Sequence, residues 1–106
     1  MASGLNDLGR FAEPALLILV ALADGPKHGY AIMTEAERIG GSPLGPGTLY
    51  AALGRLERRG LIEPMAPEHR RRPYRLTGAG AAALEEHLHE LERFARTGLT
   101  RLASQR

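Results

Sequence analysis

Cysteine and tryptophan are both absent from this sequence of 106 residues, and aromatic side chains make up only 5% of it. Without cysteine the chain cannot form disulfides, bind metal through thiolates or use a cysteine nucleophile. It is compatible with a reducing cytoplasm, where we expect the protein. The hydrophobic share of 43% is ordinary for a folded chain. One domain with a modest core is therefore expected, and a domain of this size gains stability from a partner subunit.

Long hydrophobic runs are absent as well. The longest, Ala15–Ala23, is shorter than the roughly 20 residues that a membrane-spanning helix needs. Acidic Asp7 and Glu13 precede it and Pro14 stands at its start, so we expect no secretory signal. The sequence predicts neither a membrane partner nor a targeting segment.

Patterns typical of catalytic and metal sites are also missing. Ser42, Ser104 and the four histidines offer no spacing of nucleophile, base and acid. His87 and His89 are two residues apart on a predicted helix and do not share a face, which argues against a metal site. We expect no enzyme, no metal and no cofactor, and we expect His69 to face only solvent.

The formal net charge is only +2, but positive charge is concentrated in one stretch. Residues 1–60 contain six basic and six acidic side chains, whereas residues 54–76 contain seven arginines and three glutamates. A basic patch on a near-neutral body is expected of a surface that contacts nucleic-acid phosphates. The alternative interpretation is a run of charges that only faces solvent.

Hydrophobic periodicity predicts four helices. The first is apolar almost all round, which is typical of a helix buried on most sides. A short turn rich in glycine joins the second and third helices, and Thr77 is a suitable N-cap for the fourth. Met1–Phe11 is expected to begin irregularly. The predicted helices are Glu13–Asp24, His28–Ile39, Pro46–Arg59 and about Ala79–Ala103.

Two short strands are predicted after the third helix, at Leu61–Met65 and Pro73–Leu76. They pair as a hairpin around the charged loop Glu68–Arg72, and Pro64 favours an edge position. The fold class is therefore mainly α with a small β-hairpin, a winged helix-turn-helix followed by a long C-terminal dimerisation helix. We assign residues 1–77 to DNA binding and residues 78–106 to dimerisation, within one compact unit.

In this fold the second helix of the pair enters the major groove, and the wing reaches the backbone or the minor groove. Thr48 and Tyr50 are the strongest candidates for base readout, and Gly47 lets the helix start approach the backbone. Tyr30 is expected to lie half in the core and half toward DNA. His28 contacts phosphate or, alternatively, caps its helix or packs locally. The candidate DNA-binding residues are His28, Tyr30, Gly47, Thr48, Tyr50, Arg55, Arg70, Arg71 and Arg72.

Apolar residues of the last helix recur at spacings of four and three, which is a coiled-coil-like seam over about three heptads. The seam extends past any core that this chain can build, which favours dimerisation over packing on its own domain. The seam positions are Leu84, Leu88, Leu91, Ala95, Gly98 and Leu102. The candidate dimerisation residues are Leu16, Leu84, Leu88, Leu91, Phe94, Ala95 and Leu102.

Four segments together resemble the PadR family of bacterial transcription regulators: His28–Tyr30, Pro46–Leu53, Arg55–Ile62 and Tyr74–Thr77. The resemblance covers about residues 13–95. A single helix after the wing is similar to the shorter subgroup of the family. Membership implies a homodimer formed through the first and last helices, an operator with two-fold symmetry, and repression that a small molecule releases.

The sequence departs from the family pattern at two places. Ala51 stands where the family often has proline. Members that bind flat aromatic drugs between subunits tend to carry a tryptophan on the last helix, whereas Phe94 is the only aromatic residue there in this chain. That difference argues against a multidrug pocket.

The sequence thus favours a homodimeric DNA-binding repressor whose partners are double-stranded operator DNA, a second copy and a small-molecule effector. A cleft lined by Leu88, Leu91, Phe94 and Ala95 between two copies of the last helix is the expected effector site. The alternative is a winged-helix module that binds another protein and not DNA.

Overall fold

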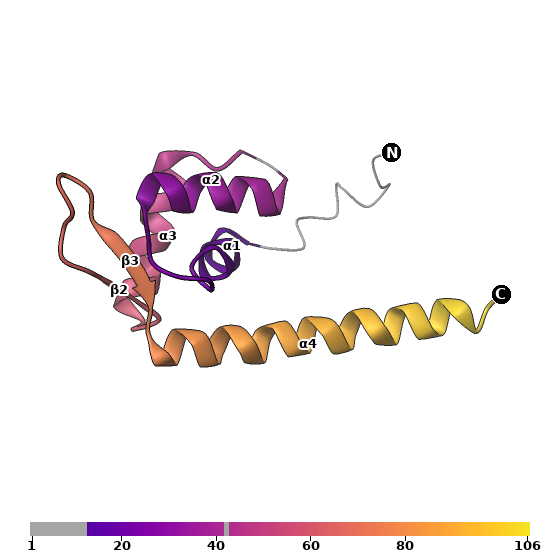
Figure 1. The fold of residues 1–106 in the computed structure, drawn as a ribbon. Coiled ribbons are helices and arrows are strands. Elements are labelled where there is room, and N and C mark those ends of the chain that lie inside the picture. The colour runs from indigo at the N-terminus through magenta and orange to yellow at the C-terminus, as the bar shows by residue number, and fades with distance from the viewer. Residues whose placement is uncertain (1–12, 42) are drawn as a thin grey trace.

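The computed structural model describes residues 13–41 and 43–106, which form four helices and a three-stranded sheet (Figure 1). The predicted mainly helical fold with a wing and a long last helix is confirmed. The irregular start expected over Met1–Phe11 lies outside the described residues, as does Ser42. The elements are α1 Pro14–Ala21, β1 Lys27–His28, α2 Gly29–Gly40, α3 Pro46–Arg58, β2 Ile62–Pro64, β3 Pro73–Leu76 and α4 Gly78–Ala103.

Helix α1 ends at Ala21, three residues before the predicted end. The backbone tightens there, because the amide of Ala23 donates to the carbonyl of Val20 at 3.1 Å. Gly25 then adopts a φ of 144°, which glycine tolerates and other residues rarely do. The other three helices begin and end within one residue of their predicted bounds.

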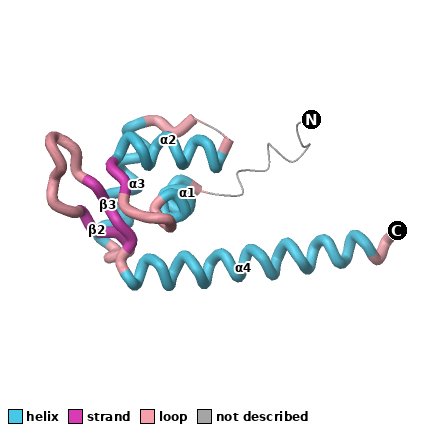
Figure 2. Tube along the Cα trace, in the orientation of Figure 1, coloured by secondary structure: helices cyan, strands magenta, loops and turns pink. Residues whose placement is uncertain are grey.

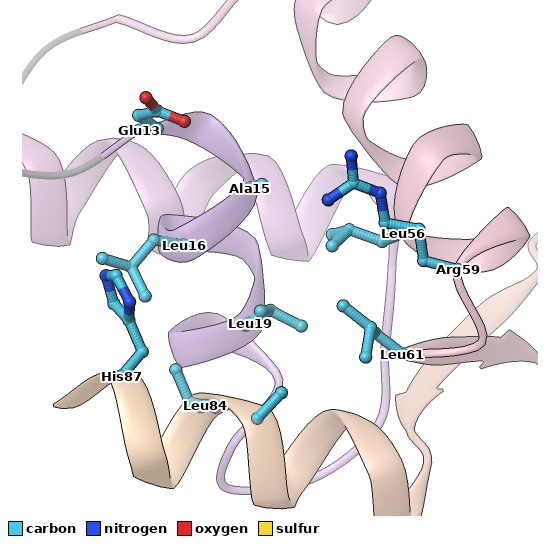
Figure 3. Close-up of a pocket in the computed structure, with 10 residues that line it drawn as sticks. Glu13, Ala15, Leu16, Leu19, Leu56, Arg59, Leu61, Leu84 and His87 are labelled. Carbon is cyan, nitrogen blue, oxygen red and sulfur yellow. The ribbon is translucent and has the colours of Figure 1, made fainter. Parts of the chain in front are cut away.

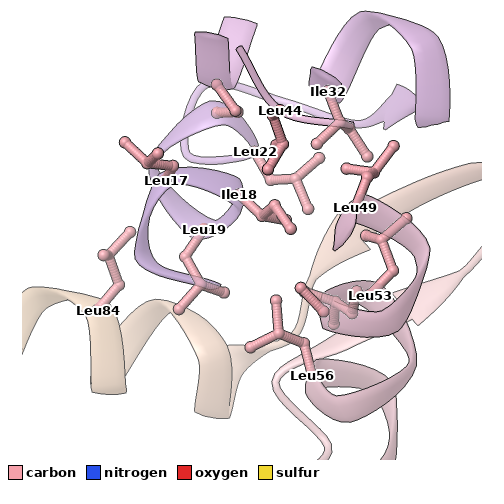
Figure 4. Close-up of a cluster of buried hydrophobic side chains, with 14 residues drawn as sticks. Leu17, Ile18, Leu19, Leu22, Ile32, Leu44, Leu49, Leu53, Leu56 and Leu84 are labelled. Carbon is pink, nitrogen blue, oxygen red and sulfur yellow. The ribbon is translucent and has the colours of Figure 1, made fainter. Parts of the chain in front are cut away.

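The core lies where α1, α2 and α3 meet, as the side chains in Figure 4 show. Helix α1 is apolar nearly all round because α2, α3 and α4 all contact it. Each fully buried aliphatic side chain contributes about 1.5–3 kcal/mol through the area removed from water. The largest fully buried side chains are Ile18, Leu22, Ile32, Leu49, Leu53 and Ile62.

The sheet is antiparallel with the strand order β1-β3-β2, so the hairpin of β2 and β3 and the edge position of Pro64 are confirmed. The prediction of only two strands was wrong, because β1 pairs with β3 and places His28 opposite Pro73. A two-residue strand is too short to show alternation in the sequence. Lys27 anchors it by donating to the carbonyl of Ala21 at 2.7 Å and by pairing with Asp24. The start of α2 is thereby attached to the wing.

Helix α4 starts beside the sheet and continues well beyond the other helices (Figures 1 and 2). The predicted N-cap is confirmed, because Thr77 Oγ1 accepts a hydrogen bond from the amide of Gly80 at 2.9 Å. The same hydroxyl donates to the carbonyl of Gly60 at 2.6 Å. From residue 85 to residue 106 every side chain is exposed except that of Leu91, which is half-buried. In the described part of the chain, no helix has both the length and the apolar character needed to cross a bilayer.

Candidate nucleic-acid interface

Helix α3 presents one face to the core and the other to solvent. Leu49, Leu53 and Leu56 are buried on the inner face. Tyr50 on the outer face is 56% exposed, and a side chain built at Gly47 would meet nothing within 4 Å. The start of the helix is therefore open to a large ligand. A shallow hollow on this face is lined by Gly47, Thr48, Tyr50, Ala51, Gly54, Arg55 and Arg58.

The ring of Tyr50 lies against the first residue of α2. Gly29 is buried there, and a Cβ atom added to it would come within 2.7 Å of the Tyr50 hydroxyl oxygen. Gly29 therefore leaves the room that Tyr50 occupies. Sequence reasoning named His28 and Tyr30 and missed the glycine between them. The signal was a glycine at the first position of a helix, where a better helix former is normally expected.

Tyr30 is 69% exposed, so the expectation that it lies half in the core was wrong. The buried face of α2 is formed by Ile32 and Ala36. Tyr30 is two residues before Ile32, about 200° around the helix at 3.6 residues per turn, and therefore lies on the opposite side. There it lines a hollow together with Tyr50 of α3 and arginines of the wing.

The tip of the wing is a closed turn of two residues. The amide of Glu68 donates to the carbonyl of Arg71 at 2.7 Å, and the amide of Arg71 donates back to Glu68 at 2.9 Å. His69 in the turn has a left-handed φ of 58°. The predicted charged loop is thus an ordered continuation of the hairpin, and it holds Arg70–Arg72 exposed.

His28 connects the wing to α2. Its Nε2 atom lies 3.1 Å from Nη1 of Arg71. A guanidinium group only donates, so in this contact Nε2 is the acceptor. The Nδ1 atom is buried and finds no hydrogen-bond partner within residues 13–41 and 43–106. His28 is also the N-cap residue of α2 through its backbone, without a capping bond from its side chain.

The wing, the start of α2 and the start of α3 enclose a common hollow of about 440 Å³, which we call the wing hollow. It brings together six of the nine predicted DNA-binding residues, and the other three lie along the outer face of α3. Exposed arginines and tyrosine hydroxyls are the donors that phosphate oxygens accept from. The wing hollow is lined by His28, Gly29, Tyr30, Tyr50, Arg70, Arg71, Arg72 and Tyr74.

Tyr74 of β3 also lines the wing hollow, although the sequence analysis did not select it as a site residue. Burial raises the pKa of its hydroxyl above the ordinary value, and the carboxylate of Glu57 raises the pKa further. The neutral hydroxyl therefore remains a donor throughout the physiological range. Arg75, its neighbour, instead forms an ion pair of 2.6 Å with Glu63 across the sheet. This pair removes one of the seven arginines of the basic stretch from the candidate interface.

A second hollow, of about 470 Å³, lies between α1, α3 and α4 (Figure 3). We call it the helix hollow. Its wall is mainly apolar, with Glu13, Arg59 and His87 as its polar members. Leu84 is only 5% exposed in a single chain and belongs to the core. The apolar residues that line the helix hollow are Ala15, Leu16, Leu19, Leu56, Leu61, Ala83 and Leu84.

The later candidate dimerisation residues have a different environment. Leu88 is 42% exposed, Leu102 is 59% exposed and Phe94 is 80% exposed. Leu99, which the sequence analysis did not select, is 68% exposed beside them. The outer part of α4 therefore carries a row of large apolar side chains in contact with water.

Comparison with known proteins decides the family. A model of the transcriptional regulator PadR-like family matches residues 18–86. The chain belongs to the PadR-like family. A PadR-like protein is a DNA-binding transcriptional regulator and not an enzyme, as the sequence predicted. Within the described residues, the one helix that follows the wing is α4.

This PadR-like chain is similar to two known relatives and to one solved structure in particular. It is 43% identical over 88 residues to transcriptional regulator Rv3488 of Mycobacterium tuberculosis, covering 80% of this chain and 81% of that protein. It is 46% identical over 86 residues to a 37.1 kDa protein in a transposon of Streptomyces fradiae. That match covers 81% of this chain but only 25% of the transposon protein, so the chain spans about a quarter of its length. A PadR family regulator from Clostridium difficile R20291 has the same fold, with a TM-score of 0.72, 28% identity and coverage of 86% and 98% of the two chains.

Proposed function

We propose that this PadR-like protein is a homodimeric repressor that binds a two-fold symmetric operator in the cytoplasm. The observation that carries the proposal is the wing hollow, where arginines from the hairpin meet tyrosines from α2 and α3. Guanidinium groups and hydroxyl donors gathered beside an exposed recognition helix match the phosphates that flank a major groove.

The start of α3 and the wing have different roles in this proposal. Thr48 and Tyr50, with Gly47 and Arg55, are proposed to read base edges from the start of α3. Arg70–Arg72 are proposed to hold phosphates, with His28 and Tyr30 beside them. Residues 1–77 then bind DNA, and residues 78–106 hold two copies together.

Replacement of Arg70–Arg72 by alanine tests the anchoring role. When phosphate contacts are lost, DNA binding releases fewer counterions. The affinity should therefore fall for all DNA sequences alike, and its salt dependence should flatten. Replacement of Thr48 or Tyr50 should instead reduce discrimination between operator and random DNA, by about 1–3 kcal/mol for each lost contact. Fluorescence anisotropy at several salt concentrations measures both effects.

Arg75→Ala is the matched control, because Arg75 is already paired with Glu63 in the same hairpin. It should leave the salt dependence almost unchanged. A wild-type dimer without salt-sensitive binding to the DNA upstream of its own gene would contradict the proposal. That result would favour a winged-helix module that binds another protein.

Dimerisation is supported by the outer part of α4, where Leu88, Phe94, Leu99 and Leu102 are exposed to water in a single chain. Burial of such side chains against a second helix removes apolar area from water and stabilises the pair. A two-fold dimer also presents two copies of α3, as a symmetric operator requires.

Release by an effector is the remaining part of the proposal. Two α4 helices in a dimer form a cleft lined by Leu88, Leu91, Phe94 and Ala95, and a ligand held there changes the spacing of the two α3 helices. A thermal-shift screen with aromatic compounds tests this step. A hit should raise the melting temperature and weaken operator binding, whereas no stabilisation by any compound would leave the cleft as plain dimer core.

A further inference from the structure

Arg71 differs from its neighbours at the tip of the wing. All of Arg70–Arg72 are exposed, but within residues 13–41 and 43–106 only Arg71 forms a side-chain hydrogen bond, to His28. Both ends of this contact stand on ordered backbone. The strand pairing of His28 with Pro73 fixes one end, and the closed turn between Glu68 and Arg71 fixes the other. The contact therefore belongs to the fold of the wing.

The contact depends on the protonation of the imidazole. Nε2 of His28 can accept from Arg71 only while it carries no proton, because both nitrogens of a protonated imidazole donate. A proton on this atom would also place a second positive charge beside the guanidinium. The opposite edge of the ring is buried at Nδ1, so Nε2 is the nitrogen that faces the wing.

The surroundings of His28 are rich in positive charge. It lines the wing hollow and also a smaller hollow of about 220 Å³ beside the hairpin. One carboxylate stands against three arginines there, so a proton on His28 adds charge to a site that is already positive. The titratable and charged groups in the two hollows are Glu68, His69 and Arg70–Arg72 of the wing, Tyr74 of β3, Tyr30 of α2 and Tyr50 of α3, and Lys27 precedes His28 in β1.

We infer that His28 is a positioning residue, which acts on DNA through Arg71 and releases it when the imidazole gains a proton. This inference rests on the phosphate contacts of Arg70–Arg72 in the proposed function and gives His28 a role separate from theirs. The bond from Nη1 leaves the remaining N–H groups of Arg71 for a phosphate. A guanidinium that is already held loses less rotamer freedom on binding DNA.

A pH titration of binding separates this role from a direct phosphate contact. If His28 touched phosphate itself, a proton would strengthen the contact and acidification would raise the affinity. If His28 holds Arg71, acidification removes the acceptor and lowers the affinity. Between about pH 7.5 and about pH 5.5, where imidazoles gain a proton, we expect the affinity for the DNA upstream of the gene to fall about tenfold. Fluorescence anisotropy at constant salt measures the change.

Substitutions at His28 supply a second readout. His28→Gln keeps an acceptor near the place of Nε2 and cannot titrate, so it should bind like the wild type near neutral pH and lose the fall on acidification. His28→Lys has a permanent positive charge and should bind about tenfold more weakly at both pH values. His69→Asn is the matched control, because it removes the other histidine of the wing, and asparagine tolerates the φ of 58° there. It should retain the fall.

Arg71→Ala tests whether His28 acts through Arg71. The fall in affinity on acidification should disappear in this variant, because the proton on His28 no longer displaces a phosphate ligand. Titration calorimetry in two buffers of different ionisation enthalpy adds the direction of proton movement. At about pH 6 the wild type should release protons on binding DNA, whereas a direct phosphate contact would take them up.

Several results would overturn the inference. They are an affinity that stays constant or rises on acidification, tighter binding by His28→Lys, proton uptake on binding, and a fall that persists in Arg71→Ala. Each would leave the DNA-binding function intact. A wild-type protein without salt-sensitive binding at either pH would instead contradict the proposed function itself.

Discussion

Gly29 shows how a missing side chain shapes the candidate interface at the scale of single residues. A methyl group there meets the Tyr50 hydroxyl at 2.7 Å, and the end of a side chain moves more readily than backbone. We predict that Gly29→Ala folds but displaces Tyr50, and that it weakens operator binding by about 1–3 kcal/mol. Melting temperature and anisotropy titrations measure the two effects.

Gly45→Ala is the control for Gly29→Ala, because a methyl group there meets nothing within 4 Å and its φ of −68° is ordinary. It should change neither stability nor binding strongly. Wild-type operator affinity in Gly29→Ala would show that the position of Tyr50 does not matter for DNA.

Tyr74 gives a pH prediction at the same scale. Burial, and next the charge of Glu57, raises the pKa of its hydroxyl above the ordinary value near 10. A raised folded-state pKa means that the stabilisation is present below pH 10 and is lost as pH rises through the folded-state value. Ultraviolet titration of the tyrosinates should show a late component that Tyr74→Phe removes. If Tyr74→Phe instead removed a tyrosine that titrates near pH 10, and left the late part of the curve unchanged, the raised pKa of Tyr74 would be contradicted.

At the scale of elements, the junction of the wing with α4 depends on a close approach between Gly80 and the turn that follows α3. A Cβ atom at Gly80 would lie 1.8 Å from the carbonyl oxygen of Leu61, which is backbone and cannot move alone. We predict that Gly80→Ala lowers the free energy of unfolding by roughly 3 kcal/mol. Thr77→Ala, which removes the cap and the bond to Gly60, should lower it by about 1–2 kcal/mol.

Urea unfolding measures the free energies of both variants. Gly78→Ala is the matched control, since it lies in the same turn of α4 and its methyl group meets nothing within 4 Å. Equal stability of Gly78→Ala and Gly80→Ala would show that α4 does not approach the α3–β2 turn this closely.

The whole molecule combines a packed body with a helix whose outer part has little contact with that body. A charge on the seam of α4 should therefore separate the two copies without unfolding either. We predict that Leu88→Glu raises the dimer dissociation constant at least tenfold, about 1.4 kcal/mol, and keeps cooperative unfolding. Binding to a two-site operator should weaken more than binding to a single half-site.

Thr100→Glu is the control for Leu88→Glu, because residue 100 lies on the face of α4 opposite the seam. Sedimentation and anisotropy follow assembly and binding. If the Leu88→Glu protein remained dimeric at the lowest concentrations at which the wild type is dimeric, the role of the seam in dimerisation would be contradicted.

The sequence by itself determined the features that depend on neighbours in the chain. The bounds of α2, α3 and α4, the Thr77 cap, the hairpin and the apolar seam follow from periodicity, capping and turn chemistry within a few residues. The basic stretch and the family segments are local patterns too, so the fold class could be predicted before any coordinates.

Only the tertiary structure decided which distant residues meet. The pairing of β1 with β3, the contact of His28 with Arg71, and the place of Tyr50 beside Gly29 each join segments separated by 20 or more residues. Tyr30 lies outside the core for the same kind of reason, because the elements that pack against α2 determine which face of α2 is buried. Such contacts depend on how helices and strands pack in space, and no short-range pattern in the chain encodes that packing.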